Sequence, residues 1–322
     1  MRLAKHTVAF VAIVFVLIVP SWALAQGYPS KPVRVVIPWP AGGLTDVTGR
    51  IVFQKISETL GQQFIIDNRP GATGSIGADL VAKSPSDGYT IMVHSTSHVS
   101  NPHIYNKLPY DTLKDFVGVG LLVAQTGLLV VHPSLPVKSV KELVALAKAR
   151  PDQILYASSG SGSFSHLAVA LLTSMTGTRM VHVPYKGGGP ATTALVSGET
   201  QFLVGSPAAV LTQINAKRLR LLAVTSDTRL PQFPDTPTVA QAGVPGYEFR
   251  AWVGVLAPAG TPKAIVDRVN AEIKKAQDSP DMRSKLESFE PWYMTPEQTA
   301  ARIKSDYDKY GKLIKLTGTK LE

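Results

Sequence analysis

The chain has 322 residues, of which 44% are hydrophobic and 17% charged, and it contains no cysteine. This composition excludes a disordered chain and a disulfide-stabilised one, and the length is enough for two ordinary domains. The formal net charge of +10 would permit nucleic-acid binding, but the lysines and arginines are scattered and an export signal argues against that partner.

The first 25 residues have the three-part pattern of a secretory signal peptide. Arg2 and Lys5 precede an apolar run from Val8 to Val19, and an A-x-A pattern ends at Ala25. The apolar run is about a dozen residues long, whereas roughly twenty are needed to span a bilayer, which argues against a membrane anchor. We expect cleavage after Ala25. Because an exported chain of this size has no cysteine, we also expect a periplasmic location.

Short apolar runs alternate with helix-like stretches from residue 32 onward. Residues 32–38, 62–68 and 89–95 are typical of buried strands, and residues 45–60 and 75–84 have helical patterns. A second alternation of the same kind extends from residue 140 to residue 225. Such alternation predicts an α/β fold of two domains with mostly parallel sheets.

Two long apolar runs, near residues 117–131 and 247–257, stand apart from this pattern. We expect them to be two strands that cross between the domains, with the C-terminal helices returning to the first domain. The expected boundaries are 1–25 for the signal peptide, 26–122 and 250–322 for domain 1, and 123–249 for domain 2. A cleft between two such domains, faced by strand-end loops, is where α/β proteins bind ligands.

Six strand-to-helix joints combine glycine or other small residues with hydroxyl side chains. They are residues 38–43, 68–75, 94–98, 158–163, 184–189 and 205–207. Glycine permits close backbone approach, and a helix N-terminus offers unpaired N–H donors with a positive partial charge. A single such loop is ordinary turn and capping chemistry. Six on one chain favour a ligand cleft that binds an anion.

The motifs of several enzyme and cofactor classes are absent. Neither G-x-x-x-x-G-K-[ST] nor G-x-G-x-x-G follows a strand, which argues against a nucleotide cofactor. Ser163 and His166 are the nearest candidates for a hydrolase nucleophile and base, but Gly160–Phe164 lacks the last glycine of a G-x-S-x-G elbow. A secreted serine hydrolase therefore stays only as the alternative function.

Metal binding is also not expected. His94, His98 and His103 follow a strand rather than lie on one predicted helix, and no acidic partner is near them in the sequence. The histidines are expected to be surface or capping groups. We predict no catalytic residue, no metal and no cofactor.

Several of the loops resemble signatures of the Bug family, the substrate-binding proteins of tripartite tricarboxylate transporters. The resemblance begins with Pro38–Gly43 followed by Asp46, and continues with Asn68–Gly74. Further landmarks occur in the family's order: Asp87–Thr90, Leu108–Asp111 with Lys114–Phe116, His182–Gly187 and Ala257–Pro262. The match extends from about Tyr28 to the C-terminus.

The resemblance implies a periplasmic binding protein of the Venus-flytrap kind, type II-like, that binds a small carboxylate and is not an enzyme. It implies delivery to one large and one small integral membrane subunit, driven by an ion gradient. We expect a monomer without a nucleic-acid partner. A subunit that presents solute to a membrane sensor would use the same cleft and differ only in its partner.

The resemblance also implies which residues contact the ligand. In the first domain, a ligand carboxylate is expected against two glycine loops and a hydroxyl loop, often through ordered water. These positions are Ala41, Gly42, Gly43, Ala72, Thr73, Gly74, Ser95, Thr96 and Ser97. In the second domain they are Ser159, Gly160, Ser163 and Tyr185. We add Trp39, Asp46 and Ser206 as further candidates for ligand contact.

One departure from the family narrows the expected ligand. Members that take amino acids tend to have an acidic residue after the strand that here reads Phe202–Val204, whereas this chain has Gly205 and Ser206. An ammonium group would lack a counter-charge there, so we expect a dicarboxylate or an aromatic carboxylate. Trp39 either stacks on a ring of the ligand or covers its own loop.

Overall fold

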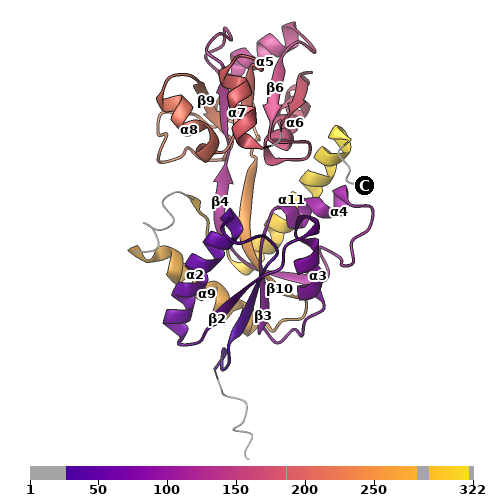
Figure 1. Cartoon of the computed structure of the whole chain (residues 1–322), viewed down its shortest axis with the longest axis vertical. Helices are drawn as coiled ribbons and strands as arrows, with labels where there is room; N and C mark the ends of the chain where they lie inside the picture. The colour runs from indigo at the N-terminus through magenta and orange to yellow at the C-terminus, as the bar shows by residue number, and fades with distance from the viewer. Residues whose placement is uncertain (1–26, 186, 281–289, 319–322) are drawn as a thin grey trace, which may run out of the picture.

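The computed structural model describes residues 27–185, 187–280 and 290–318, which form two lobes, each built around one β-sheet (Figure 1). The expected two-domain α/β architecture is confirmed. The predicted signal peptide lies outside the described residues. Within them, no helix combines the length and the apolar character of a membrane span.

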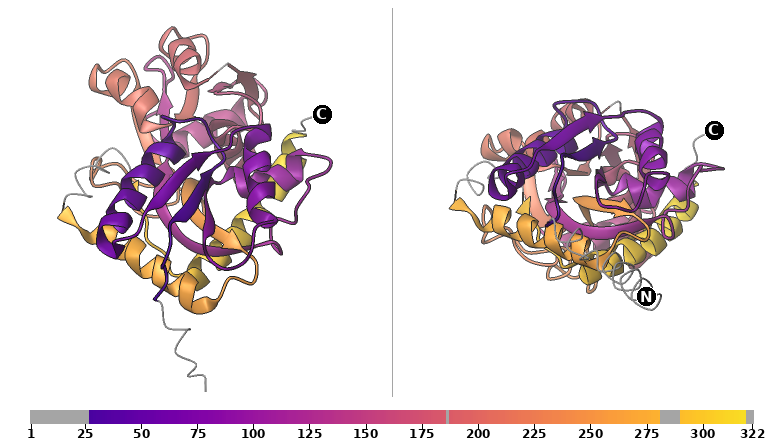
Figure 2. Two further views of the ribbon diagram at one scale, coloured as in Figure 1. Left: turned by 60° about the horizontal axis from the view of Figure 1, so that its bottom comes forward. Right: turned by 90° about the horizontal axis from the view of Figure 1, so that it is seen from below.

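The first lobe contains a six-stranded sheet in the order β11-β4-β10-β3-β1-β2. Its strands are β1 (Val33–Ile37), β2 (Phe64–Asn68), β3 (Thr90–Ser95), β4 (Phe116–Thr126), β10 (Arg250–Pro258) and β11 (Glu290–Pro291). Its helices are α2 (Leu44–Leu60), the short η2 (Ala72–Gly74), α3 (Ser75–Ala82), α4 (Ser97–Ile104), α9 (Lys263–Asp278) and α11 (Pro296–Thr317). Both C-terminal helices, α9 and α11, pack on β4, and Figure 2 shows them side by side in orange and yellow.

The second lobe contains a five-stranded sheet in the order β7-β6-β8-β5-β9. Its strands are β5 (Leu128–Val131), β6 (Leu155–Ser158), β7 (Val181–Pro184), β8 (Phe202–Gly205) and β9 (Arg220–Val224). Its helices are α5 (Val140–Ala149), α6 (Phe164–Thr176), α7 (Gly188–Val196) and α8 (Pro207–Asn215).

Both sheets are mixed, and the predicted βαβ units form their parallel part. The βαβ units pair in parallel, β1 with β2 and β3 in one lobe, and β6 with β7 and β8 in the other. The strands of the lobe crossings run antiparallel to their neighbours: β10 to β3 and β4, and β5 to β8 and β9. Such strands enter from the other lobe, so no crossover helix imposes parallel direction on them.

The first predicted crossing run is two strands rather than one. β4 ends at Thr126 and β5 begins at Leu128, so the chain passes between the sheets at Gly127. A Cβ added to Gly127 would lie 2.6 Å from a methyl carbon of Val204 and 2.9 Å from the Phe164 ring. Only glycine therefore permits this close crossing. The second crossing is β10, which begins at Arg250. The residue boundaries predicted for the domains stay a prediction.

The alternation of apolar residues in the strands produces separate cores on the two sheet faces. In β1, the side chains of Val33, Val35 and Ile37 join Phe53 of α2 in one core, while Val36 belongs to the core on the opposite face. This is the period of two expected of a strand that is buried on both faces. The cores hold the strands rigid and so fix the loops at their carboxyl ends.

Candidate functional site

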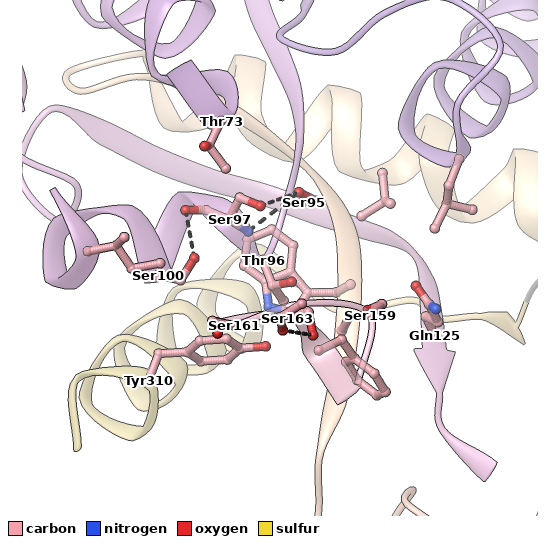
Figure 3. A pocket seen from close by; sticks show the side chains of 18 of the residues that line it. Thr73, Ser95, Thr96, Ser97, Ser100, Gln125, Ser159, Ser161, Ser163 and Tyr310 are labelled. Atoms are coloured by element: carbon pink, nitrogen blue, oxygen red, sulfur yellow. Dashed lines mark hydrogen bonds between the residues drawn. The ribbon is translucent and has the colours of Figure 1, made fainter. Parts of the chain in front are cut away.

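A cavity of about 440 Å³ lies between the lobes (Figure 3). It is lined by strand ends of both crossings, by loops that begin helices, and by one residue of α11. The lining residues are Leu44, Thr73, Ser95, Thr96, Ser97, Ser100, Ile104, Val123, Gln125, Ser159 to Phe164, Ala251, Trp252, Val253 and Tyr310.

The hydroxyl loop after β3 forms one wall of the cavity. The Ser97 N–H donates to Ser95 Oγ at 3.4 Å, and Ser95 Oγ donates to Ser97 Oγ at 3.3 Å (Figure 3). The Thr96 N–H donates to the carbonyl of Trp252 at 3.1 Å, which ties this loop to β10. The structure thus brings the three predicted residues Ser95, Thr96 and Ser97 to the cavity, where they open helix α4.

The loop at residues 71–74 contributes only Thr73 to the lining. The Thr73 backbone has a φ of 53°, and the Thr73 Oγ1 lies 2.8 Å from the Tyr105 hydroxyl. Gly74 has a φ of 90°, and its N–H donates to the carbonyl of Gly71 at 2.9 Å. Ala72 and Gly74 lie outside the cavity lining, and the Gly74 amide is occupied by the protein itself.

Residues 40–43 of the loop at residues 38–43 are exposed, and the next residue, Leu44 at the start of α2, lines the cavity. The Gly42 N–H donates to the Asp46 carboxylate at 2.9 Å. Protein acceptors therefore occupy the amides of Gly42 and Gly74 in this structure. Contact of Ala41, Gly42 or Gly43 with a ligand stays a prediction.

Asp46 joins the two glycine loops instead of facing the cavity. Its side chain is 2% exposed and accepts from Gly42, from Arg50 Nε at 2.9 Å and from Asn68 Nδ2 at 2.8 Å. Burial by itself raises the pKa of this carboxyl, but the hydrogen bonds from Arg50, Gly42 and Asn68 outweigh it and hold the pKa below its ordinary value. A carboxylate that is fully used by internal donors positions the loops around it.

Trp39 lies outside the cavity lining, partly buried against the core under β1 and α2. Its ring meets the edge of His94 at a centroid distance of 6.0 Å. In this conformation the Trp39 ring packs on the core and on His94, and its contact with a ligand stays a prediction.

The opposite wall is the loop between β6 and α6. Ser159, Gly160 and Ser163 were expected at the site, and all three line the cavity together with Ser161 and Gly162. Ser163 caps α6, and its Oγ donates to the Gly160 carbonyl at 2.6 Å. Figure 3 shows the Ser159, Ser161 and Ser163 side chains close together on this wall.

Two predicted second-lobe residues lie outside the lining. The Tyr185 hydroxyl donates to Glu199 at 2.7 Å, and burial together with this bond raises the tyrosine pKa to about 12. Ser206 begins α8 at the end of β8. Ligand contact by Tyr185 or Ser206 stays a prediction.

Sequence reasoning missed cavity residues that come from distant segments. Gln125 lies near the end of β4, Trp252 lies on β10, and Tyr310 lies on α11. The Trp252 indole N–H donates to Asp306 of α11 at 2.9 Å, which holds that helix against the cavity. No loop motif marks these residues, because long strands and helices carry them. Only the expectation that two strands cross between the domains could have pointed to Gln125 and Trp252.

The electrostatic character of the cavity comes from backbone dipoles. None of its described lining residues carries a formal charge at neutral pH. The first residues of three helices, Leu44 of α2, Ser97 of α4 and Phe164 of α6, all line it. A helix N-terminus has a positive partial charge and N–H donors without partners inside the helix, so three N-termini at one cavity favour an anion.

The arrangement of Ser163 and His166 is not that of a nucleophile and its base. The Ser163 hydroxyl donates to a backbone carbonyl, and His166 Nδ1 accepts the Gly162 N–H at 2.9 Å. Among the residues that the structure describes, no cluster of three or more histidine and acidic side chains has a metal-binding arrangement.

The expectation that the histidines are surface or capping groups is wrong for three of them. His94 and His98 are fully buried and His166 is 6% exposed. Burial lowers the pKa of His98 to about 4 and that of His94 well below its ordinary value, with the neighbouring His98 contributing to the latter. These imidazoles are neutral at neutral pH.

Residues 48–319 match the model of the "Tripartite tricarboxylate transporter family receptor" family. The chain is 42% identical over 292 residues to the "UPF0065 protein in tcbD-tcbE intergenic region" of Pseudomonas sp. (strain P51), covering 90% of this chain and 87% of that protein.

Two solved structures provide a comparison of shape. A TctC solute-binding protein from Polaromonas, solved with no ligand, is 30% identical and superposes with a TM-score of 0.83, covering 89% of this chain and 99% of that one. The R. palustris protein Rpa4515 with adipate is 36% identical and superposes with a TM-score of 0.70, covering 90% of this chain and 98% of that one.

Proposed function

Because this chain belongs to the tripartite tricarboxylate transporter receptor family, we propose that it captures a small organic carboxylate between its lobes and delivers it to a transporter of that type. The family consists of periplasmic solute receptors, and the chain is a binding protein rather than an enzyme. The single observation that carries the proposal is the cavity at which the N-termini of three helices meet without a charged side chain.

Helix-terminal amides and hydroxyls can replace the water around a carboxylate. Hydrogen bonds to a charged group contribute about 1.5–3 kcal/mol each, and the water-excluding setting between two lobes strengthens them. The donors here belong to regular elements, since Ser97 begins α4 and Ser163 caps α6. Their placement therefore costs little entropy when the ligand binds.

The distribution of hydroxyls favours a ligand with two polar ends. Ser95 and Ser97 stand on the first-lobe wall, and Ser159 and Ser163 stand on the second-lobe wall. Val123 and other apolar side chains also line the cavity. A dicarboxylate such as the adipate held by the R. palustris relative matches this pattern. An aromatic monocarboxylate would use only one hydroxyl wall.

An amino acid is not the proposed ligand. The described lining contains no carboxylate to balance an ammonium group, and burial of an unpaired charge is costly. Ser206, which caps the start of α8, follows the strand after which members that take amino acids tend to have an acidic residue. The ligand class is therefore a dicarboxylate, or an aromatic carboxylate, without an amine.

Ligand binding is proposed to be coupled to lobe closure. The chain superposes better on the relative with no ligand than on the one with adipate, although it is less identical to the former. This supports the interpretation that the present conformation is open. A ligand that bridges Ser97 and Ser163 has more partners when the lobes approach, so it would shift the population toward the closed form.

The proposed partners are one large and one small membrane subunit of a secondary transporter, with this chain acting as a monomer after cleavage at Ala25. Presentation of the solute to a membrane sensor is the alternative role of the same cavity. A serine hydrolase is disfavoured by the contacts of Ser163 and His166 described above.

A thermal-shift screen with mono-, di- and aromatic carboxylates tests the proposal, because a ligand stabilises the folded state by mass action. A dicarboxylate should raise the melting temperature, and aspartate and glutamate should not. The same acid should lose most of its effect on Ser97→Ala but keep it on Ser134→Ala, an exposed serine outside the cavity. Stabilisation by aspartate alone would overturn the ligand class, and hydrolysis of an ester that Ser163→Ala abolishes would support the enzyme.

A further inference from the structure

Two stacked histidines lie directly behind the second-lobe wall of the cavity. His166 belongs to α6 and His182 to β7, and their ring centroids are 3.9 Å apart with planes 3° from parallel. Tyr156 of β6 stacks on His182 from one side at 5.0 Å. The proposed carboxylate site makes no use of either imidazole, since neither lines the cavity.

Each ring holds a different part of the loop at residues 158–163. His166 Nδ1 accepts the Gly162 N–H at 2.9 Å. His182 Nε2 lies 2.6 Å from the hydroxyl of Ser158, whose Oγ also bonds both the N–H and the carbonyl of Gly160 at 3.1 Å. Both contacts therefore end on glycines that line the cavity.

Those glycines cannot hold the loop by their own conformational preference. Gly160 has a φ of 131° and Gly162 a φ of 74°, which are conformations that glycine enters and leaves without steric cost. The backbone bond from the Ser163 N–H to the Gly160 carbonyl, and the contacts of Ser165 Oγ with Ser159 and Ser163, hold part of the loop. The histidine pair adds the bonds that fix Gly162 directly and Gly160 through Ser158, so it helps to set where the loop meets a ligand.

We infer that His166 and His182 are positioning residues for ligand binding, and that His166 holds the Gly162 amide only while its ring is neutral. The inference rests on the proposed function, because it assumes that the loop contacts the carboxylate. A proton on Nδ1 would place two donors face to face, so the bond to Gly162 would be lost.

The surroundings of the pair keep His166 neutral. The titratable groups that lie against it are His182 on β7 and, at 6.4 Å between ring centroids, Tyr156 on β6. Burial, with the charge of His182 as the second cause, lowers the pKa of His166 to about 4. Burial also lowers the pKa of His182, and it raises that of Tyr156, which stays uncharged. No carboxylate of the described residues shifts the pKa of either histidine.

Stacking on His182 therefore disfavours protonation of His166 and keeps its Nδ1 an acceptor for Gly162. Two positive rings 3.9 Å apart would repel, so a proton taken by His182 disfavours a second proton on His166. A carboxylate bound on the cavity side would instead favour a proton on His166, because opposite charges attract. That proton would also break the bond to Gly162, which disfavours it. Variants without a titrating ring at position 166 separate these two effects on binding.

The test compares two substitutions of His166 by calorimetric titration with the carboxylate found in the screen. Asparagine places Oδ1 where Nδ1 lies and keeps an acceptor for Gly162, so His166→Asn should retain affinity at pH 7. Phenylalanine keeps a ring but no acceptor, so His166→Phe should weaken binding about tenfold. Equal affinity of the two variants would overturn the positioning role.

The pH profile supplies a readout that a purely structural role would not move. Wild-type affinity should fall as the pH drops from 6 toward 4, and the fall should be smaller for His166→Asn, which has no ring to protonate. In His182→Gln, whose amide still reaches Ser158 but carries no charge, the fall should begin at a higher pH. The ligand's own titration is common to all three proteins, so it cancels in their ratios. Parallel profiles would overturn the inference.

Amide hydrogen exchange in the ligand-free protein separates this inference from the proposed function. Exchange at Gly162 should be slow in the wild type and in His166→Asn, and faster in His166→Phe. If no carboxylate binds but exchange follows this order, the proposed function fails and the role of His166 in ordering the loop stands. If carboxylates bind but exchange and affinity are the same in both variants, the positioning role fails.

Discussion

Replacing Asp46 by alanine should release both glycine loops of the first lobe at once. The carboxylate is 2% exposed and accepts from Gly42, Arg50 and Asn68 at 2.8–2.9 Å. Gly42 belongs to one loop and Asn68 begins the other. The substitution therefore removes a carboxylate that bonds both loops and leaves the bond from Asn68 Nδ2 to the Trp39 carbonyl between them.

The cost can be worked out from these contacts. Two hydrogen bonds from neutral donors to a charged acceptor contribute about 1.5 kcal/mol each at the lower end of their range, which is about 3 kcal/mol for Gly42 and Asn68. The Arg50 side chain is 48% exposed, so its ion pair adds at most about 1 kcal/mol after solvent screening. We expect Asp46→Ala to lower the free energy of unfolding by 3–4 kcal/mol, on the order given by these principles.

Urea denaturation followed by circular dichroism measures this loss. Asp267→Asn is the matched control, because Asp267 forms an exposed i,i+4 pair with Lys263. It should change stability by less than about 0.5 kcal/mol. If Asp46→Ala unfolded at the wild-type urea concentration and only lost carboxylate binding, Asp46 would be a ligand contact and its role in joining the two loops would be refuted.

Three further predictions concern other parts of the first lobe. Gly74→Ala should destabilise the protein by about 2 kcal/mol or more, because an added Cβ would lie 2.7 Å from the His94 ring. The control is Gly61→Ala, which also has a positive φ but open space around it, and it should cost less in the same denaturation assay. Equal losses of stability would contradict the clash. Trp252→Phe should cost about 1–3 kcal/mol, because the indole N–H donates to a buried carboxylate of α11; an unchanged melting temperature would contradict that. Stability should fall as the pH drops from 6.5 to 5, because the folded pKa values of His94 and His98 lie below their unfolded values and the unfolded chain therefore binds more protons. Each histidine contributes up to about 1.4 kcal/mol per pH unit. A flat stability profile over that window would show that these rings are charged in the folded protein.

The strand-and-helix order followed from local apolar patterns, whereas the misses have one local cause and one that depends on the whole chain. Residues 32–38 and 45–60 alternate with the periods of a strand and a helix, and they fold as β1 and α2. Helix α4 was not predicted, because its eight residues include Pro102 and follow β3 almost without a break. The antiparallel direction of β5 and β10 depends on which lobe each strand enters from. That is a property of the whole chain, and no window of sequence carries it.

Part of the candidate site could be predicted from local sequence and part could not. Glycines and hydroxyl residues mark the loops that begin helices, and the lining of the cavity includes the predicted serines Ser95, Ser97, Ser159 and Ser163. The spacing of Gly42 and Asp46 shows that they lie near each other, but whether a carboxylate serves a ligand or a backbone amide depends on its rotamer and its neighbours.

The contributions of the crossing strands and of α11 had no local signal. Gln125 and Tyr310 are separated by most of the chain, and the lobes bring them to one cavity. The histidine pair behind the second-lobe loop likewise depends on β7 lying beside β6. Such contacts arise from the topology of the sheets, so short motifs could not have predicted them.

The most direct test of the account is a calorimetric titration at pH 7 with dicarboxylates and aromatic carboxylates, each paired with its methyl ester. If helix N-termini hold a negative charge between the lobes, one acid should bind with one-to-one stoichiometry and its ester should bind far more weakly. Saturable binding of an ester as tight as that of its acid, or no binding of any carboxylate, would contradict the account.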